Sequence, residues 1–257
     1  FKTQTIDQMS YFRQYSVRYV YEFDNHFGIT AQLRHITQTP TGSLFYRNLD
    51  GLMVPKLTQS EATLSLRYAP GEQVVVTKQR RHPVNHNYPI FTLMHTAGFK
   101  GVLGGDYASN YTELSLTKRF WLNSWGRIDV YARAGAQWNK VPFPLLITPE
   151  ANNSYVIQRN MFNLINNMEF MNDRFVSVAL QWDLSGKLFN RIPLLKHLKW
   201  REVIGFKTLY GTLTDKNNPY KQTGGGELFG FPSRNGMPTS FVMGDAPYME
   251  LNVGIHN

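Results

Sequence analysis

The chain has no cysteine among its 257 residues, and acidic residues are few. The absence of cysteine excludes disulfide bonds, cysteine nucleophiles and thiolate metal ligands from this sequence. The 18 Asp and Glu residues stand against 27 Lys and Arg residues, which gives a formal net charge of +9. Basic loops facing acidic lipopolysaccharide would account for that sign. No apolar run approaches the roughly 18 residues of a membrane-spanning helix, so the sequence predicts no such helix.

Aromatic residues are abundant instead. The chain contains 17 Phe, 14 Tyr and 5 Trp, whereas charged residues make up only 18% of it. Aromatic side chains favour strands, and a soluble helical domain would contain more Ala, Glu and Lys. With 42% hydrophobic residues the chain can bury a core. The composition therefore favours a folded β protein.

Apolar and polar residues alternate with a period of two along most of the chain, which is typical of β-strands. In the clearest segment, apolar side chains from Ile128 to Trp138 alternate with polar ones from Arg127 to Gln137. The other segments are 15–23, 29–34, 61–68, 91–100, 111–122, 162–170, 176–185, 200–213 and 249–255. About ten segments of roughly 10 residues match tilted strands that cross a bilayer. The sequence predicts an all-β fold, a transmembrane antiparallel β-barrel of the outer-membrane type.

The two faces of these segments support the barrel. One face is aliphatic with aromatic residues near its ends, and the other is polar, as in lipid-facing and lumen-facing positions. A soluble sandwich, with one face in a core and one in water, remains the alternative. Short turns at 24–28 and 123–126 alternate with the long segments 39–60, 70–89, 140–158 and 214–246, as periplasmic turns and external loops would. We expect residues 1–257 to be one barrel domain of a longer chain, whose N-terminal domain and closing strands lie outside this sequence.

Two groups of residues are candidates for a functional site. Charged residues on the polar faces are candidate lumen charges that pair with one another: Arg127, Asp129, Arg133, Glu169, Asp183 and Glu202. A Gly-rich segment is a candidate inserted loop, formed by Gly224, Gly225, Gly226, Phe229, Gly230, Phe231 and Arg234. Dense glycine permits close backbone approach and positive φ, which a loop folding back into a barrel needs. A flexible external loop is the alternative.

Residues 187–199 depart from the period of two. Leu188, Ile192 and Leu195 lie near helical spacing, with Pro193 between them. The segment is either a connecting loop or an interfacial segment whose cations meet anionic lipid headgroups. Those cations are Lys187, Arg191, Lys196 and Lys199.

The sequence predicts no catalytic, cofactor-binding or metal-binding residue. His82 and His86 have a ligand spacing, but Pro83 disfavours a helix there and no acidic third ligand is near. A Gly-x-Ser-x-Gly elbow is missing, although the serines and seven histidines leave a lipase-like barrel enzyme open. Lys and Arg are scattered rather than gathered into a stripe, so we expect no nucleic-acid partner.

Several stretches resemble one known family. They are residues 161–175, 188–195, 198–205, 210–217 and 247–257. The family is a Bacteroidota outer-membrane family whose barrel, a domain of unknown function, follows a carboxypeptidase-regulatory-like domain. The resemblance is best over residues 160–257. It implies an outer-membrane barrel preceded by a β-sandwich domain, and it supplies no established activity.

A more distant similarity is to the surface-antigen barrels of outer-membrane assembly and secretion factors. Those barrels carry a long inward loop that ends in Arg-Gly-Phe/Tyr, followed by a Gly-Gly-Asp/Asn strand. Phe229-Gly230-Phe231 and Gly244-Asp245 occupy similar relative places, but Phe229 replaces the arginine, so its usual lumenal ion pair cannot form.

From these patterns and resemblances we expect a non-enzymatic protein of the bacterial outer membrane. It would contact membrane lipid and lipopolysaccharide, need no cofactor, and act in outer-membrane protein assembly or export or as a barrel subunit of a larger envelope complex. A passive pore or transporter is the alternative, and a lipase-like barrel enzyme is the second alternative.

Overall fold

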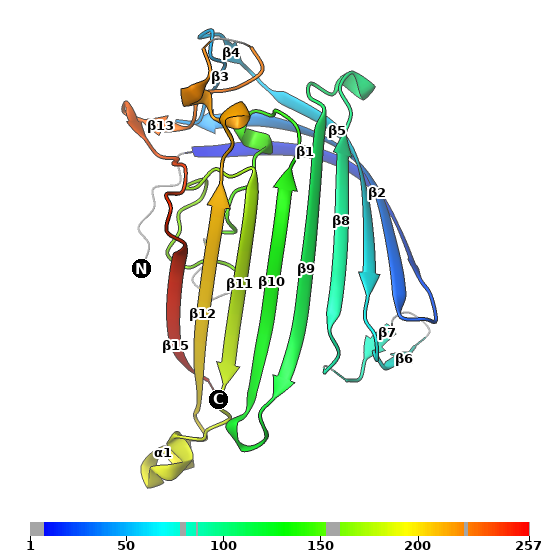
Figure 1. Cartoon of the computed structure of the whole chain (residues 1–257), viewed down its shortest axis with the longest axis vertical. Coiled ribbons are helices and arrows are strands. Elements are labelled where there is room, and N and C mark those ends of the chain that lie inside the picture. The colour runs from blue at the N-terminus through cyan, green and yellow to red at the C-terminus, as the bar shows by residue number, and fades with distance from the viewer. Residues whose placement is uncertain (1–7, 78–80, 86, 153–159, 224–225, 257) are drawn as a thin grey trace.

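A computed structural model describes residues 8–77, 81–85, 87–152, 160–223 and 226–256. Nine strands form one antiparallel sheet in which each strand pairs with the next strand of the sheet along the chain (Figure 1). The strands are β1 (Gln8–Glu22), β2 (Phe27–Gly42), β5 (Leu57–Tyr68), β8 (Ile90–Gly98), β9 (Ser109–Trp121), β10 (Arg127–Gln137), β11 (Arg174–Asp183), β12 (Arg201–Thr212) and β15 (Tyr248–His256). The all-β prediction is therefore confirmed.

The sheet is a curved, open wall. In the view of Figure 1, β1 and β2 bend across the top of the other strands, which gives the sheet a concave and a convex face. Its edges are β1 and β15, which do not pair with each other within the described part of the chain. Several strands are far longer than the ~5–6 residues usual in soluble proteins; β2 has 16 residues and β1 has 15. No helix among the described residues is long and apolar enough to span a membrane.

The connections divide between the two ends of the sheet. Four connections lie at the upper end in Figure 1: 43–56, 99–108, 138–173 and 213–247. The first contains the hairpin of β3 (Tyr46–Arg47) and β4 (Met53–Val54), the second contains η1 (Val102–Gly104), and the third contains η3 (Phe143–Leu145). The fourth contains η5 (Asp215–Asn217), η6 (Pro219–Lys221) and the hairpin of β13 (Ser233–Arg234) and β14 (Met237–Pro238). At the lower end lie 23–26, 69–89, with β6 (Val74–Val76) and β7 (Arg81–Pro83), 122–126, with η2 (Asn123–Trp125), and 184–200, with η4 (Phe189–Arg191) and α1 (Pro193–Leu198). The prediction placed 70–89 with the long loops, at the end opposite the short turns 24–28 and 123–126. This prediction is wrong, because successive connections of a meander alternate between the two ends and 70–89 lies at the same end as the short turns.

One predicted strand is also absent. Residues 162–170 belong to the connection 138–173 and contribute no strand to the sheet. Two of their apolar residues belong to a small hydrophobic cluster on the concave side, which we call the inner cluster: Phe162, Ile165, Phe175 and Leu209. Phe170 packs against this cluster, whereas Met168 packs against a different one and Leu164 is 72% exposed. The alternating apolar residues of 162–170 therefore do not share one buried face, as those of a strand would.

The turn between β9 and β10 depends on Gly126, whose φ is 79°. A Cβ atom at this position would lie 1.9 Å from the carbonyl oxygen of Asp183. We expect Gly126→Ala to lower the free energy of unfolding by about 1–3 kcal/mol, the usual range for a strained backbone. Urea unfolding midpoints measure this change. Gly244→Ala is the matched control, because nothing lies within 4 Å of a Cβ there; equal midpoints for the two variants would contradict the assignment.

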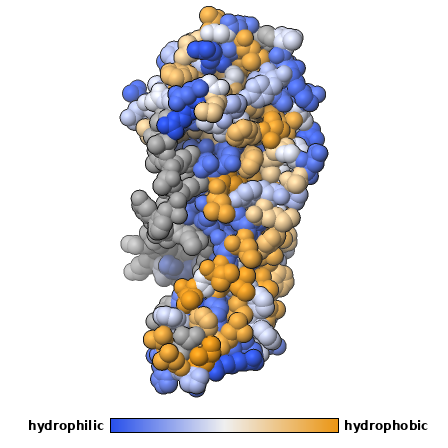
Figure 2. All heavy atoms as spheres, turned by 90° about the vertical axis from the view of Figure 1, so that its left-hand side faces the viewer, coloured by the Kyte–Doolittle hydropathy of each residue, from blue (hydrophilic) through white to orange (hydrophobic). Residues whose placement is uncertain are grey.

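The convex face of the sheet is largely apolar and exposed. The strand registers bring the even-numbered residues of β10 beside Leu114 of β9 and Val176 of β11. Exposed aliphatic side chains on this face are Val17, Leu33, Leu64, Leu66, Leu93, Leu114, Val176, Leu251, Val253 and Ile255. Exposure reaches 75% at Val253. In Figure 2, hydrophobic residues gather below the upper loops, which are mostly hydrophilic.

Aromatic side chains border the convex face near its lower end. They come from β1, β2, β5, β8, β9 and β11 and are Tyr21, Phe27, Tyr68, Phe91, Phe120 and Trp182. Phe27 and Tyr68 stack with ring centroids 4.4 Å apart. Lys118, on the same face, donates a hydrogen bond from Nζ to the backbone oxygen of Asn87 below the sheet. Its apolar stem thus lies along the face while the charge reaches the lower rim.

The main hydrophobic core lies among the upper loops. We call it the cap cluster: Leu44, Tyr46, Leu57, Val141, Phe143, Leu146, Met171, Phe229 and Phe231. Its members come from β5 and the connections 43–56, 138–173 and 213–247. The loops therefore pack on one another and close the upper end of the wall.

Candidate functional site

The concave face carries ion pairs. Arg133 of β10 donates from Nε to Glu113 of β9 at 2.8 Å. Its Nη1 also donates to Glu150 of the connection 138–173 at 2.5 Å. Arg34 of β2 donates from Nε to Glu61 of β5 at 2.9 Å. Through Glu150, Arg133 joins the sheet to the connection 138–173, which covers the concave face.

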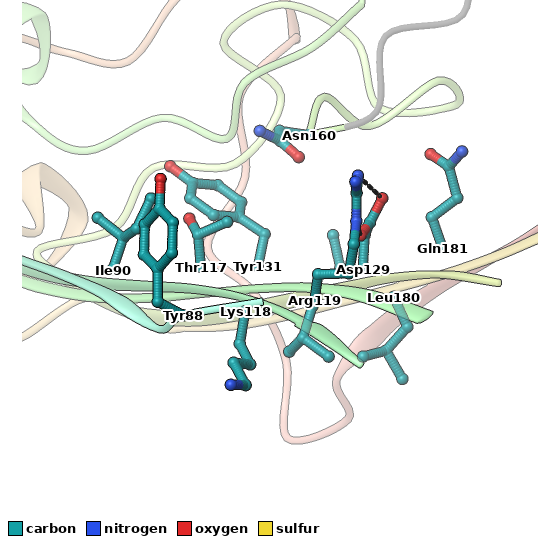
Figure 3. A pocket seen from close by; sticks show the side chains of 12 residues that line it. Tyr88, Ile90, Thr117, Lys118, Arg119, Asp129, Tyr131, Asn160, Leu180 and Gln181 are labelled. Atoms are coloured by element: carbon teal, nitrogen blue, oxygen red, sulfur yellow. Dashed lines mark hydrogen bonds and ion pairs between the residues drawn. The ribbon is translucent and has the colours of Figure 1, made fainter. Parts of the chain in front are cut away.

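Four of the predicted charges lie on this concave face. Arg127 lies 3.2 Å from Asp183, measured between Nη2 and Oδ2. Asp129 accepts a 2.5 Å hydrogen bond from Nε of Arg119. Figure 3 shows the Arg119–Asp129 pair and Tyr131 pointing to one side of the sheet, toward Asn160, while Lys118 and Leu180 point to the other. Arg133 completes the set, so these four charges are neutralised within the wall.

The other two predicted charges lie elsewhere. Glu169 is in the connection 138–173 rather than on a strand, and it accepts a 2.6 Å hydrogen bond from the backbone N–H of Asn166. Glu202 pairs in register with Ile255, which belongs to the convex face. Its carboxylate is buried and accepts hydrogen bonds from the backbone N–H groups of Leu188 and Phe189, which compensate the burial. Neither residue is part of the concave charge pattern.

Residues 161–164 are held against the concave face by two charged side chains. Glu250 of β15 accepts the backbone N–H of Asn163 at 2.9 Å and that of Leu164 at 2.7 Å. Lys207 of β12 donates from Nζ to the carbonyl oxygen of Met161. These polar contacts and the inner cluster fix the connection 138–173 across β12 and β15.

The Gly-rich segment packs in the cap cluster. Gly224 and Gly225 lie outside the described residues, whereas Gly226 is exposed. Phe229 is 1% exposed, stacks on Tyr46 with centroids 5.5 Å apart, and meets the edges of further rings. The backbone N–H of Gly230 donates to the carbonyl oxygen of Arg47 at 2.9 Å.

Beyond these contacts, the Gly-rich segment reaches the surface. Phe231 packs edge-on against Tyr220 with centroids 5.4 Å apart. Arg234 is exposed on the short strand β13. The aromatic part of the segment is therefore buried in the upper end of the wall, and its arginine is not.

Burial raises the pKa of two tyrosines around Phe229. It raises the pKa of Tyr107 to about 12, with the carboxylates of Asp106 and Glu227 acting in the same direction. Burial also raises the pKa of Tyr46, against a smaller lowering by its hydrogen bond with Ser10. Both phenols are uncharged at neutral pH, so the cap cluster holds no buried phenolate.

Asp173 joins the two longest upper connections, and sequence reasoning missed it. It is fully buried at the start of β11. Its Oδ2 accepts hydrogen bonds from the backbone N–H of Thr214 at 3.1 Å and from Nδ2 of Asn217 at 2.9 Å. Asn217 in turn accepts the backbone N–H of Val141 at 2.9 Å. The sequence pattern predicts only a turn at Asp173. It gives no sign of these contacts, because Thr214 and Asn217 lie more than 30 residues away in the sequence.

We expect Asp173→Ala to lower the free energy of unfolding by about 1–3 kcal/mol, because buried donors of Thr214 and Asn217 lose their acceptor. Urea midpoints and the rate of protease cleavage in the upper loops measure the loss. The matched control is Asp215→Ala, which removes an exposed ion pair with Lys221 and should change the midpoint little. A midpoint for Asp173→Ala as high as the control's would contradict the role of Asp173.

Two open cavities lie along the sheet. One of about 430 Å³ lies between the concave face and residues 144–148, and Arg34, Glu61 and Arg133 are among its lining residues. The other, of about 250 Å³, is the pocket of Figure 3, beside Arg119 and Asp129. Among the described residues no group of three His, Asp or Glu side chains could hold a metal ion. His86 lies outside the described residues, so the predicted His82–His86 pair is not placed.

Comparison with known families gives one match. Residues 45–226 match the model for the C-terminal domain of a family of unknown function, DUF5686. The matched range runs from the upper connection 43–56 to the Gly-rich segment and includes six strands of the large sheet, β5 to β12. A search of the curated proteins finds no match.

Proposed function

The chain belongs to the DUF5686 family of unknown function, and we propose that it forms part of the wall of a β-barrel in a bacterial outer membrane. The observation that carries the proposal is the bare apolar convex face, on which Val253, Val17 and Leu251 are 75%, 73% and 71% exposed. Apolar surface is unfavourable in water by roughly 25 cal/mol for each Å². Lipid removes that cost over the whole face.

The distribution of polarity supports a barrel over a soluble sandwich. In a sandwich, the apolar face of each sheet is covered and the polar face meets water. Here the polar concave face is the covered one, with Glu250, Lys207 and Arg133 bound to residues of the loop 138–173. In lipid, the backbone N–H and C=O groups of the two edge strands must also find hydrogen-bond partners, and closure of the sheet into a barrel supplies them. The proposal therefore includes further strands that join β1 to β15, together with the β-sandwich domain implied by the resemblance.

For the role of this barrel we propose outer-membrane protein assembly or export, or service as a barrel subunit of a larger envelope complex, without enzymatic activity. The loops over the concave face favour this role over a passive pore, because the connection 138–173 is bound across the space that a pore would keep open. Arg127, Asp129 and Asp183 are paired within the wall, and Phe229 and Phe231 pack into the upper end. The Bacteroidota source and the contact with lipopolysaccharide are parts of the same proposal.

Cysteine scanning tests the placement in lipid, since the 257 residues contain no cysteine. Single cysteines at Leu64 and Val253 probe the convex face, and cysteines at the adjacent Ser65 and Asn252 probe the concave face. In outer-membrane preparations of the full-length protein we expect a lipid-confined reagent to label the first pair and not the second. Equal labelling of both pairs, or a full-length protein that remains soluble without detergent, would overturn the barrel.

Two further measurements test the role. Single-channel recordings of the reconstituted protein should show no steady conductance, whereas a passive pore predicts one. Depletion of the protein in cells should lower the amounts of other outer-membrane proteins. Unchanged amounts would argue against a role in assembly while leaving the barrel itself intact.

A further inference from the structure

The connection between β11 and β12 carries a concentrated positive charge. We call residues 187–201 the basic foot; they contain Lys187, Arg191, Lys196, Lys199 and Arg201 and no acidic residue. Figure 1 shows α1 of this segment projecting below the sheet. Within the described part of the chain, none of these five cations forms an ion pair. Their charge is therefore available to an external anion.

The basic foot also exposes apolar side chains. Leu194 is 76% exposed, and Ile192 and Leu188 are 48% and 46% exposed. Leu198 and Trp200 are exposed as well. Cations mixed with exposed aliphatic and aromatic side chains are typical of segments that lie in a membrane interface.

The foot begins on the convex side of the wall. Glu202 has a convex register position, and its carboxylate accepts the backbone N–H groups of Leu188 and Phe189. The turn at 188–189 is thereby fixed to the face that we assign to lipid.

Tryptophans connect the foot with the aromatic border of the convex face. Nε1 of Trp182 donates to the carbonyl oxygen of Trp125 at 2.8 Å, and the two rings lie 6.3 Å apart. The ammonium group of Lys187 lies 4.9 Å from the centroid of the Trp125 ring. Tryptophan concentrates at the level of lipid headgroups, so the foot starts at that level.

We propose that the basic foot binds the phosphate headgroups of anionic phospholipids, with Leu194 and Ile192 inserted among the upper parts of the acyl chains. The inference rests on the proposed barrel and adds a lipid-recognition surface to it. Clusters of Lys and Arg next to a membrane span attract anionic headgroups. At the opposite end of the sheet, two of the lysines, Lys140 and Lys221, lie beside Glu227 and Asp215.

The position of the foot selects phospholipid rather than lipopolysaccharide. The foot lies at the end with the shortest connections, 23–26 and 122–126, and the longest ones, 138–173 and 213–247, lie at the other end. In outer-membrane barrels the short turns face the periplasm and the long loops face outward. The foot therefore meets the inner leaflet, whose anionic lipids are phospholipids.

The test uses the full-length protein in vesicles, with a fluorophore on Leu194→Cys for the foot or on Val253→Cys for the wall. Vesicles consist of phosphatidylcholine with brominated acyl chains, with or without about 30% phosphatidylglycerol, an anionic lipid. Quenching at position 194 should rise about twofold or more with the anionic lipid, and the rise should vanish in about 0.5 M salt, where charges are screened.

Two variants with equal loss of charge separate local from general electrostatics. The foot variant carries Lys187→Gln, Arg191→Gln, Lys196→Gln and Lys199→Gln. The upper-loop control carries Lys56→Gln, Lys140→Gln, Lys216→Gln and Lys221→Gln. The rise in quenching at position 194 should disappear in the foot variant and persist in the control.

The outcomes distinguish the foot from the barrel. If position 253 is quenched and position 194 is not, the foot proposal fails and the barrel stands. The same conclusion follows if the quenching at position 194 is equal in neutral and anionic vesicles. Loss of the rise in both charge variants also defeats the foot proposal. If position 253 is not quenched in any vesicle, the barrel fails first.

Discussion

Phe229→Ala should lower the free energy of unfolding by about 3–5 kcal/mol, the usual cost of removing a buried phenylalanine ring. Phe229 lies against three rings, those of Tyr46, Phe143 and Tyr107, at centroid distances of 5.5, 6.3 and 6.1 Å. Aromatic contacts of this kind add stability beyond the area that they bury. Because Phe229 and these three rings come from four different connections, the cavity left by the mutation should loosen the whole upper end.

Urea unfolding of the detergent-purified protein measures the effect, and limited proteolysis shows where the chain loosens. Phe241→Ala is the matched control, because the ring of Phe241 is 49% exposed in the same connection. Phe229→Leu should fall between the two, since it keeps part of the apolar volume. If Phe229→Ala unfolds at the same urea concentration as Phe241→Ala, the cap cluster does not hold the loops together.

The sheet could be predicted from the sequence because a strand's alternation is a local property. The clear pattern from Arg127 to Trp138 coincides with β10, and its polar residues share the concave face. The same reasoning failed at 162–170, a connection whose alternating apolar residues do not share one face: Phe162 is buried in the inner cluster, whereas Leu164 is 72% exposed. It also placed Glu202 among the polar-face charges, although Glu202 shares the register of Ile255. A shift of one residue moves a side chain to the opposite face.

The loop contacts could not be predicted in this way. Asp173 and Asn217, or Glu250 and Leu164, lie far apart in the sequence, and no local pattern announces their hydrogen bonds. These contacts support one of the two interpretations of the alternation, the barrel that we propose. A sandwich and a barrel share the same period of two, but only the folded chain shows that the polar face is the one that the loops cover.

Leu64→Arg should therefore strongly reduce folding into the membrane, by about 2–4 kcal/mol if Leu64 lies near the bilayer midplane. Leu64 is in the middle of β5, is 49% exposed and points to the convex face beside Ala31 and His95. An arginine there would bring its charge into hydrocarbon, and neither Ala31 nor His95, the residues paired with Leu64, offers an acidic partner. The fraction of heat-modifiable, folded protein in outer-membrane preparations measures the effect.

Ser65→Arg is the matched control, one residue along the same strand and on the concave face, opposite Thr30 and Met94. A charge at that position lies on the concave face rather than in lipid, so most of the protein should still fold in the membrane. A soluble protein would give a different result, because a new arginine on a water-exposed convex face costs little. Equal folding of the two variants would thus reject lipid as the environment of the convex face, whatever the fate of the upper loops.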